Sequence, residues 1–142
     1  MLFSEKFFIF TLNFPIYKRL KQTNGEMKQF DSSLLHDKLK EYFGFSSFKG
    51  NQEAVIRNVL EGKDTFVLMP TGGGKSVTFQ VPALAMEGIC LVITPLIALM
   101  RDQVDNLRRV GIKATAVYSG MGRQEIVAEL ENCVSGQYKF LY

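Results

Sequence analysis

The sequence predicts an α/β fold in which helices flank a parallel sheet, and three observations support this class. Short apolar runs rich in strand formers alternate with segments whose apolar residues recur at helical spacing. The chain has 142 residues, of which 46% are hydrophobic, and this is enough to bury the core of one domain. Glycines follow several of the predicted helices, where a left-handed residue commonly ends a helix. We therefore expect consecutive strands to run parallel and to be joined by right-handed crossovers.

The first regular elements are two amphipathic helices. Leu35, Leu39 and Phe43 fall on one face of a helix that is expected to end at Gly44. A second helix is predicted over residues 51–60, again with its apolar residues on one side. Both helices precede the first predicted strand.

The periodicity changes at the apolar run Thr65–Met69, which is rich in residues that favour strands. A run that is apolar throughout is typical of a parallel strand covered on both faces. From there, helices are predicted at 74–85, 97–109 and 124–134, and strands at 89–93, 114–118 and 138–142. The last of these strands ends at the final residue, so we expect an incomplete, truncated sheet.

The formal net charge of +3 does not by itself indicate a nucleic-acid partner, because of where the charge lies. Residues 1–30 contain five Lys or Arg and two Asp or Glu, whereas residues 31–142 contain twelve of each sign. Nucleic-acid binding must therefore be argued from particular loops.

Residues 1–26 differ in composition from the rest, with five Phe in the first fourteen positions. A membrane-spanning helix needs about 20 apolar residues, and this segment is interrupted by Lys6 and Pro15. It also lacks the pattern of a secretory signal, so we expect a cytoplasmic protein with no membrane partner. Because Met27 stands just ahead of the first helix, residues 1–26 are interpreted as a disordered leader or an upstream translation artefact, and 27–142 as the domain. A short strand or helix docked on the domain is the alternative.

Metal binding by protein side chains alone is not predicted. The cysteines Cys90 and Cys133 and the one histidine, His36, are too few and too scattered for a zinc site or a disulfide framework. Cys90 lies in an apolar run and is expected to be a buried, reduced thiol.

The most specific motif is Pro70-Thr71-Gly72-Gly73-Gly74-Lys75-Ser76, between a predicted strand and a predicted helix. Strand, glycine-rich loop and helix in that order are the context of a Walker A phosphate-binding loop. The glycines let backbone N–H groups surround a polyphosphate, and the helix N-terminus adds the positive end of its dipole. Lys75 is expected to reach the β- and γ-phosphates of ATP and the Ser76 hydroxyl to bind Mg²⁺, which makes these two the predicted catalytic residues. The alternative is a flexible glycine-rich turn with a solvated lysine.

The surrounding residues resemble the RecQ family of DNA helicases. Met69 departs from the small residue that usually begins a Walker A loop, and Met69–Ser76 with the following Phe79–Ala83 is similar to motif I of that family. Upstream, Phe43–Gln52 resembles motif 0, and downstream Thr94–Val104 resembles motif Ia. The three motifs in this order implicate residues 31–142 as the first half of the family's first motor domain. The resemblance implies a RecA-like fold.

Motif 0 recognises adenine in the family, and the resemblance carries this role to Phe45, Lys49 and Gln52. The Gln52 amide offers one donor and one acceptor that match the adenine edge, which would select ATP over GTP. Phe45 stands where the family places a stacking aromatic residue, with ordinary packing after a helix end as the alternative. Lys49 stands where an arginine is usual, and without a flat guanidinium it is expected to hold the base less well. Phe48 is expected to pack against the core.

The resemblance to motif Ia implies contacts with the backbone of single-stranded DNA. Thr94 ends a predicted strand, Pro95 forbids its continuation, and the next helix begins with N–H groups suited to a phosphate. Arg101 lies in the second turn of that helix and is predicted to add a charged contact, and Tyr118 is a further candidate. The same helix is expected to face the core through Met100, Val104 and Leu107.

These features predict an ATP-dependent DNA helicase of the RecQ type, with 3′–5′ unwinding implied by the resemblance. The sequence has no Asp-Glu-x-His motif and lacks the family's second motor domain, zinc-binding region and winged helix, so its expected partners are DNA and the rest of the helicase. We expect the chain to bind ATP weakly without hydrolysing it or unwinding DNA. Two alternatives stay open: a module that uses ATP binding without hydrolysis to clamp nucleic acid, and a fragment that does not fold stably.

Overall fold

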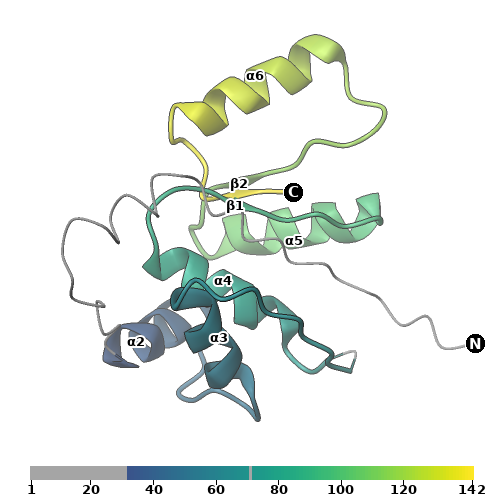
Figure 1. Ribbon diagram of the computed structural model, residues 1–142. Coiled ribbons are helices and arrows are strands. Elements are labelled where there is room, and N and C mark those ends of the chain that lie inside the picture. The colour runs from purple at the N-terminus through teal and green to yellow at the C-terminus, as the bar shows by residue number, and fades with distance from the viewer. Residues whose placement is uncertain (1–31, 71) are drawn as a thin grey trace, which may run out of the picture. The chain divides into compact units, whose positions relative to one another are not determined.

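The computed structural model describes residues 32–70 and 72–142, which form two compact units, 32–85 and 86–142, each considered by itself (Figure 1). The interpretations of the leader and of a start at Met27 fall on residues outside this description, and so does the role of Thr71. No helix among the described residues combines the length and the apolar character needed to cross a membrane.

The unit 32–85 contains three helices, α2 (Ser32–Phe43), α3 (Gln52–Leu60) and α4 (Lys75–Ala85). Helix α4 contacts both α2 and α3. The apolar stripe predicted for α2 is buried at Leu35 and Leu39, and Ile56 of α3 and Val81 of α4 are fully buried. Burying each of these side chains contributes roughly 1.5–3 kcal/mol of hydrophobic stabilisation. The predicted helices are thereby confirmed, and their buried faces form the core of this unit.

The predicted strand at Thr65–Met69 is wrong. These residues are not assigned to a strand, and within the described residues no backbone hydrogen bond links them to a neighbouring strand. Phe66 and Leu68 are 82% and 80% exposed, whereas the residues between and beside them are half-buried. A strand requires a partner that completes its ladder of hydrogen bonds, and the apolar pattern of a single segment carries no information about that partner. The expected burial of both faces is therefore also wrong.

The unit 86–142 alternates strands and helices: β1 (Cys90–Leu91), α5 (Ile97–Arg109), β2 (Ala114–Thr115), α6 (Arg123–Val134) and β3 (Phe140–Leu141). The strands form a parallel sheet in the order β1-β3-β2. Phe140 of β3 is in register with Cys90 on one side and with Ala114 on the other. The predicted α/β class and parallel pairing are confirmed, although each strand is shorter than its apolar run.

Helices α5 and α6 lie on opposite sides of this sheet (Figure 1). The chain moves two positions across the sheet between β1 and β2, and then one position back to β3. Since crossovers between parallel strands are right-handed, a reversal of direction places the two connecting helices on opposite faces. The core of the unit lies around Phe140 and Ala114, both with no exposed surface, and Leu107 of α5 is 2% exposed.

Glycines end the helices as the sequence predicts. A glycine with a positive φ follows four of the helices, α2, α3, α5 and α6, within one or two positions: Gly44, Gly62, Gly111 and Gly136. At Gly44 the backbone N–H donates a hydrogen bond to the carbonyl of Lys40 at 3.1 Å, which satisfies one of the unpaired carbonyls of the last turn.

A lysine at the start of β3 fixes the loop that leads into β1. The Nζ of Lys139 donates hydrogen bonds to the backbone carbonyls of Met86 at 2.5 Å and Gly88 at 2.8 Å. Burial lowers the pKa of Lys139 from its usual value, because the charged form loses part of its hydration. No motif in the sequence pointed to this contact.

Candidate functional site

The glycine-rich loop ends where α4 begins, at Lys75, so the loop and the helix follow each other as predicted, although the strand expected before them is not formed. Gly72 and Gly74 have φ values of 78° and 76°, which side chains with a Cβ rarely adopt. The N–H of Gly73 donates to the Pro70 carbonyl at 3.0 Å, and a Cβ on residue 73 would lie 2.9 Å from that oxygen. Side chains are therefore disfavoured in this loop, at positions 72 and 74 by the backbone conformation and at position 73 by the close approach of the Pro70 carbonyl.

The two predicted catalytic residues occupy the first turn of α4. The Nζ of Lys75 lies 3.4 Å from the carbonyl oxygen of Met69, at the other end of the loop, so that the lysine side chain reaches across the loop. Ser76 is half-buried next to it. The first N–H groups of a helix have no intrahelical carbonyl to bind, and together they attract an anion.

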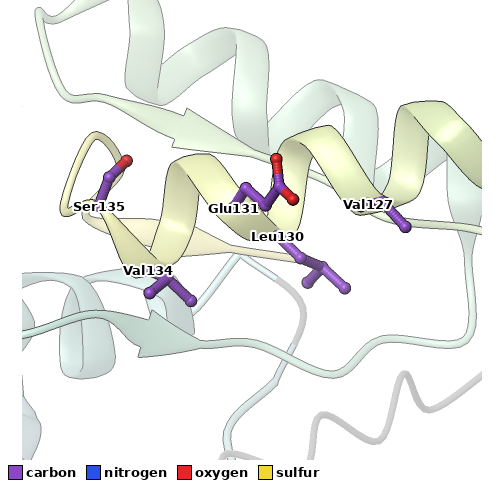
Figure 2. Close-up of a pocket in the computed structure, with 5 residues that line it drawn as sticks. All are labelled: Val127, Leu130, Glu131, Val134 and Ser135. Carbon is purple, nitrogen blue, oxygen red and sulfur yellow. The ribbon is translucent and has the colours of Figure 1, made fainter.

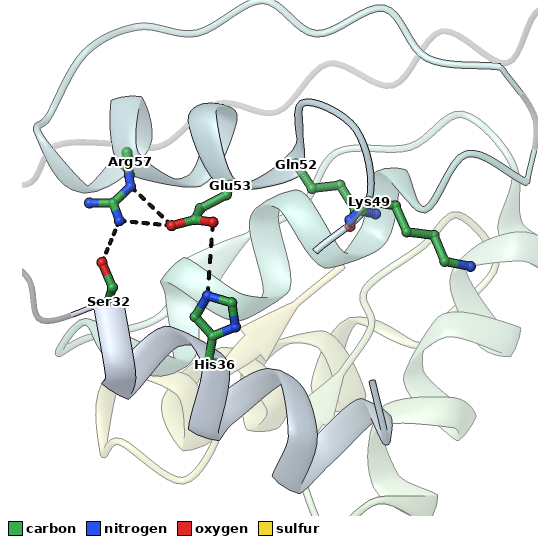
Figure 3. Close-up of polar contacts among 6 residues, drawn as sticks. All are labelled: Ser32, His36, Lys49, Gln52, Glu53 and Arg57. Atoms are coloured by element: carbon green, nitrogen blue, oxygen red, sulfur yellow. Dashed lines mark hydrogen bonds and ion pairs between the residues drawn. The ribbon is translucent and has the colours of Figure 1, made fainter. Parts of the chain in front are cut away.

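Gln52 joins motif 0 to this loop. Its side chain is 4% exposed, and Nε2 donates to the carbonyls of Gly74 at 3.2 Å and Gly73 at 3.5 Å. Its Oε1 accepts a hydrogen bond from the N–H of Lys49 at 2.8 Å (Figure 3). The structure thus brings Gln52 into contact with Gly73 and Gly74, which lie 21 and 22 positions further along the sequence.

The other motif 0 residues lie near each other at the surface. The Nζ of Lys49 is 5.5 Å from the centroid of the Phe45 ring, and Phe45 is 47% exposed. An exposed ring is available to stack on a flat ligand, which supports the functional interpretation of Phe45 over core packing. Phe48 is half-buried, and its ring meets that of His36 edge to face at a centroid distance of 5.0 Å. Phe48 therefore has the structural role expected of it.

A polar network holds α2 and α3 together beside this motif (Figure 3). Arg57 pairs with Glu53 at 2.7 Å and also donates to the hydroxyl of Ser32. The second carboxylate oxygen of Glu53 lies 3.8 Å from Nε2 of His36. Each of these exposed or half-exposed contacts contributes little to the free energy of folding. Together they link α2 to α3, the helix that begins with Gln52.

The predicted DNA contacts belong to the unit 86–142. Thr94 follows β1, and its Oγ1 accepts a long hydrogen bond, 3.5 Å, from the N–H of Leu96 just before α5. Arg101 is exposed on α5, and its Nη2 donates to the hydroxyl of Tyr118 at 2.7 Å. The residues predicted to be the core stripe of α5 are buried, as expected: Met100, Val104 and Leu107.

The unit 86–142 contains a cavity at the sheet and another along α6. One of about 310 Å³ includes Thr94, Val117 and Tyr142, and so lies at the carboxyl ends of the three strands. The other, of about 370 Å³, runs along α6 and is lined by Val127, Leu130, Glu131, Val134 and Ser135 (Figure 2). Because sheet ligands usually bind at the carboxyl ends of parallel strands, the first cavity is the one relevant to the predicted contacts.

The described residues contain no group of three or more His, Cys, Asp or Glu that could hold a metal ion. The thiol of Cys90 is partly buried, and burial raises its pKa to about 11. A thiol in this state is a poor nucleophile and a poor metal ligand.

A comparison with protein families matches residues 49–141 to the DEAD/DEAH box helicases. The chain belongs to this family. The architecture fits, since a parallel sheet flanked by helices and preceded in the sequence by a glycine-rich loop is part of a RecA-like motor domain.

Among known proteins, the chain is similar to the ATP-dependent DNA helicase RecQ of Bacillus subtilis (strain 168), with 47% identity over 105 residues. It is also 45% identical over 109 residues to the probable ATP-dependent DNA helicase RecS of the same organism, and 48% identical over 103 residues to the ATP-dependent DNA helicase Q-like 4B of Arabidopsis thaliana. Within its family the chain is therefore of the RecQ type. These matches cover 73%, 76% and 70% of this chain, but only 18%, 22% and 9% of the respective relatives.

Proposed function

We propose that this chain binds ATP with Mg²⁺ as part of an ATP-dependent DNA helicase of the RecQ type. One observation carries this proposal: the buried amide of Gln52 contacts the loop at Gly73 and Gly74. Gln52, whose amide is suited to hydrogen bonding with adenine, therefore lies next to a glycine-rich loop that is suited to binding phosphates. Both are in the same compact unit, so the two halves of a nucleotide would be recognised next to each other.

The loop fits a triphosphate for a steric reason. A Cβ on Gly73 would press on the Pro70 carbonyl, and one on Gly74 would collide with Gln52, so only glycine leaves the inner side of the loop open to phosphate oxygens. In the proposed complex, Lys75 gives up its long contact with the Met69 carbonyl and binds the terminal phosphates. Bound Mg²⁺ would supply charge neutralisation between the β- and γ-phosphates, and the Ser76 hydroxyl is the group that would hold it.

Phe45, Lys49 and Gln52 would bind the base. Gln52 already uses both ends of its amide, so reading adenine requires it to exchange at least one of these hydrogen bonds for one to the base. The exposed ring of Phe45 would stack on the base, and the Lys49 ammonium beside it would add charge without the flat surface of an arginine. ATP is therefore expected to bind more tightly than GTP, but weakly.

In the same proposal, Thr94 and Arg101 contact the backbone of single-stranded DNA. Hydrolysis needs an acidic residue that holds Mg²⁺, a group that orients the attacking water and an arginine that stabilises the transferring phosphoryl group. Our proposal assigns none of these roles to a residue of this chain. We therefore propose that the chain binds ATP without turning it over, and that unwinding belongs to the longer proteins it resembles.

Calorimetric titration with Mg-ATP tests this proposal. The wild-type chain should release heat and bind ATP more tightly than GTP. Lys75→Ala should weaken the binding of both ATP and GTP, because the phosphate contact is common to them. Gln52→Ala should weaken the binding of ATP and abolish the preference for ATP over GTP. Lys63→Ala is a matched control, since this exposed lysine pairs with Glu61 at 2.5 Å, outside the loop. Absence of heat with wild-type chain that is folded by circular dichroism would refute the proposal.

A further inference from the structure

Arg101 and Tyr118 form a pair that combines two kinds of contact. The Nη2 of Arg101 donates a hydrogen bond of 2.7 Å to the phenol oxygen of Tyr118, and the Cζ of the guanidinium lies 4.7 Å from the centroid of the Tyr118 ring. The first contact fixes the direction of the guanidinium, and the second holds it over the ring by cation–π attraction. Few degrees of freedom are left to this arginine, although it is exposed.

The backbone of Tyr118 is itself held in place. The N–H of Met121 donates to the Tyr118 carbonyl at 3.4 Å across a turn in which Gly120 has a φ of 100°. The N–H of Tyr118 contacts the sulfur of Met121 at 3.4 Å, and the preceding N–H, of Val117, donates to the Tyr142 carbonyl at 2.7 Å. The backbone from which the Tyr118 side chain reaches Arg101 is therefore held by hydrogen bonds.

The partner of Arg101 is a neutral phenol, unlike the carboxylate partners of Arg57 and Lys38. Arg57 pairs with Glu53 at 2.7 Å, and Lys38 pairs with Glu41 at 2.9 Å. Among the residues that the structure describes, Arg101 forms no ion pair with a carboxylate, although Asp105 is one helical turn away. A phenol orients the guanidinium without cancelling its charge, so the full charge stays available for an anion.

The pair lies at the ligand-binding edge of the sheet. Leu91 of β1 and Thr115 of β2 are both in register with Leu141 of β3, and Thr94 and Tyr118 each follow their registered residue by three positions. Since all three strands are parallel, Thr94 and Tyr118 leave the sheet at the same edge, that of the carboxyl ends. Thr94 also lines the cavity at this edge.

We propose that Tyr118 is a positioning residue that holds the Arg101 guanidinium, uncompensated and oriented, for a phosphate of single-stranded DNA. This inference rests on the proposed function and deepens it. It assigns to Tyr118 no contact with DNA: the residue acts through Arg101, by removing in advance the rotamer freedom that the arginine would otherwise lose on binding.

A double-mutant cycle on binding of a fluorescein-labelled thymidine oligonucleotide, followed by anisotropy over a range of KCl concentrations, tests this. Arg101→Ala should weaken binding and lower the slope of log Kd against log salt by about 0.7, the value for one phosphate contact of a single strand. Tyr118→Leu should weaken binding by about two- to tenfold, as expected when one flexible side chain must be ordered on binding. Tyr118→Phe, which keeps the ring and loses the hydroxyl, should fall between Tyr118→Leu and wild type.

The decisive arm is Tyr118→Leu in the Arg101→Ala background. If Tyr118 acts through Arg101, this second substitution changes neither the affinity nor the salt slope. Arg109→Ala removes a charge from the same helix, where the side chain contacts Asn106 at 3.2 Å, and should bind as wild type does. Thermal unfolding of each variant shows whether it is folded, and Tyr118→Phe provides the measurement if Tyr118→Leu is not.

Three results would overturn the inference: full additivity of the two substitutions, wild-type affinity of both Tyr118 variants, or no binding of the oligonucleotide by the wild-type chain. Each is distinguishable from failure of the proposed function by calorimetry with Mg-ATP. A chain that binds ATP but shows either of the first two results retains the nucleotide site and loses only the role of Tyr118. Absence of oligonucleotide binding would in addition remove the proposed DNA contacts of Thr94 and Arg101.

Discussion

The side-chain nitrogen of Gln52 occupies the space that a side chain on residue 74 would need. Nε2 donates to the Gly74 carbonyl at 3.2 Å, and a Cβ built on Gly74 would collide with the same nitrogen. Gln52, the residue proposed to recognise adenine, is thus packed against the glycine-rich loop. A substitution of Gln52 should therefore alter the loop, and a substitution in the loop should alter the position of Gln52.

A comparison of Gly74→Ala with Gly72→Ala separates this contact from backbone strain. The φ values of the two residues are nearly equal, 76° at Gly74 and 78° at Gly72. A Cβ on residue 72, however, would meet nothing within 4 Å. Gly72→Ala should therefore lower the free energy of unfolding by about 1–2 kcal/mol, the cost of a left-handed non-glycine residue. Gly74→Ala should lose roughly a further 1–3 kcal/mol through steric overlap with Gln52.

Urea denaturation of the two variants measures this difference, and calorimetry with Mg-ATP accompanies it. Gln52→Ala combined with Gly74→Ala should recover the steric part of the loss but not the strain. Equal destabilisation by the two glycine substitutions would show that Gln52 does not occupy this space in solution.

Phe66→Thr together with Leu68→Thr tests the segment that the sequence led us to expect as a buried strand. Because these side chains are 82% and 80% exposed, the double substitution should change the free energy of unfolding by no more than about 1 kcal/mol, or about 0.5 for each site. Ile56→Ala, at a fully buried position of α3, is the contrasting control and should cost about 2–5 kcal/mol. A loss of the same size in the double variant would mean that a partner covers residues 65–69.

The helices could be predicted because their determinants are local. The burial of Leu35 and Leu39 follows from their spacing of four, and the positive φ of Gly44 follows from the need for a left-handed residue after the last turn. The glycine-rich loop ahead of a helix could be located for the same reason, since its glycines, its lysine and the start of α4 are contiguous. Alternation of strands and helices in residues 86–142 likewise predicted the parallel sheet.

What could not be predicted depends on residues distant in the sequence. The strand expected at Thr65–Met69 lacks a partner among the described residues, and periodicity does not reveal whether one exists. The contact of Gln52 with Gly74 spans 22 positions, and that of Arg101 with Tyr118 spans 17. Their types indicated roles toward ligands, but no pattern within one segment indicated that they would touch.

Lys139→Met should destabilise the chain although it removes a charge that is half-buried. The Lys139 ammonium is the donor to two backbone carbonyls, those of Met86 and Gly88, and hydrogen bonds to a charged group are worth about 1.5–3 kcal/mol. We expect a loss of about 1–3 kcal/mol in urea denaturation, because part of the apolar stem is kept by methionine. Lys113→Met, at an exposed lysine whose side chain is not part of this contact, should be nearly neutral. Similar losses in both variants would indicate a general effect of charge.

The thiol of Cys90 should make the chain less stable as the pH rises above 9. Burial raises its pKa from 9.0 to about 11, so between these values the native chain keeps a proton that the unfolded chain releases. The stabilisation is thus complete below pH 9.0 and is lost as the pH approaches about 11, with a size of the order of 2 kcal/mol. The lowered pKa of Lys139 acts in the opposite direction just below 10.5, since there the unfolded chain binds more protons.

Comparison of wild type with Cys90→Ala reports on the thiol together with its charge interaction with Lys139, which is lost in the variant. The advantage of the wild type in free energy of unfolding should shrink steadily above pH 9.0, whereas parallel curves would contradict the raised pKa. The same shift predicts slow labelling by an aromatic disulfide reagent at about pH 8, where only about one thiol in a thousand is ionised. Cys133, whose pKa is also raised but which is less buried, should react first, and Cys90 should react fully only once the chain is unfolded in urea.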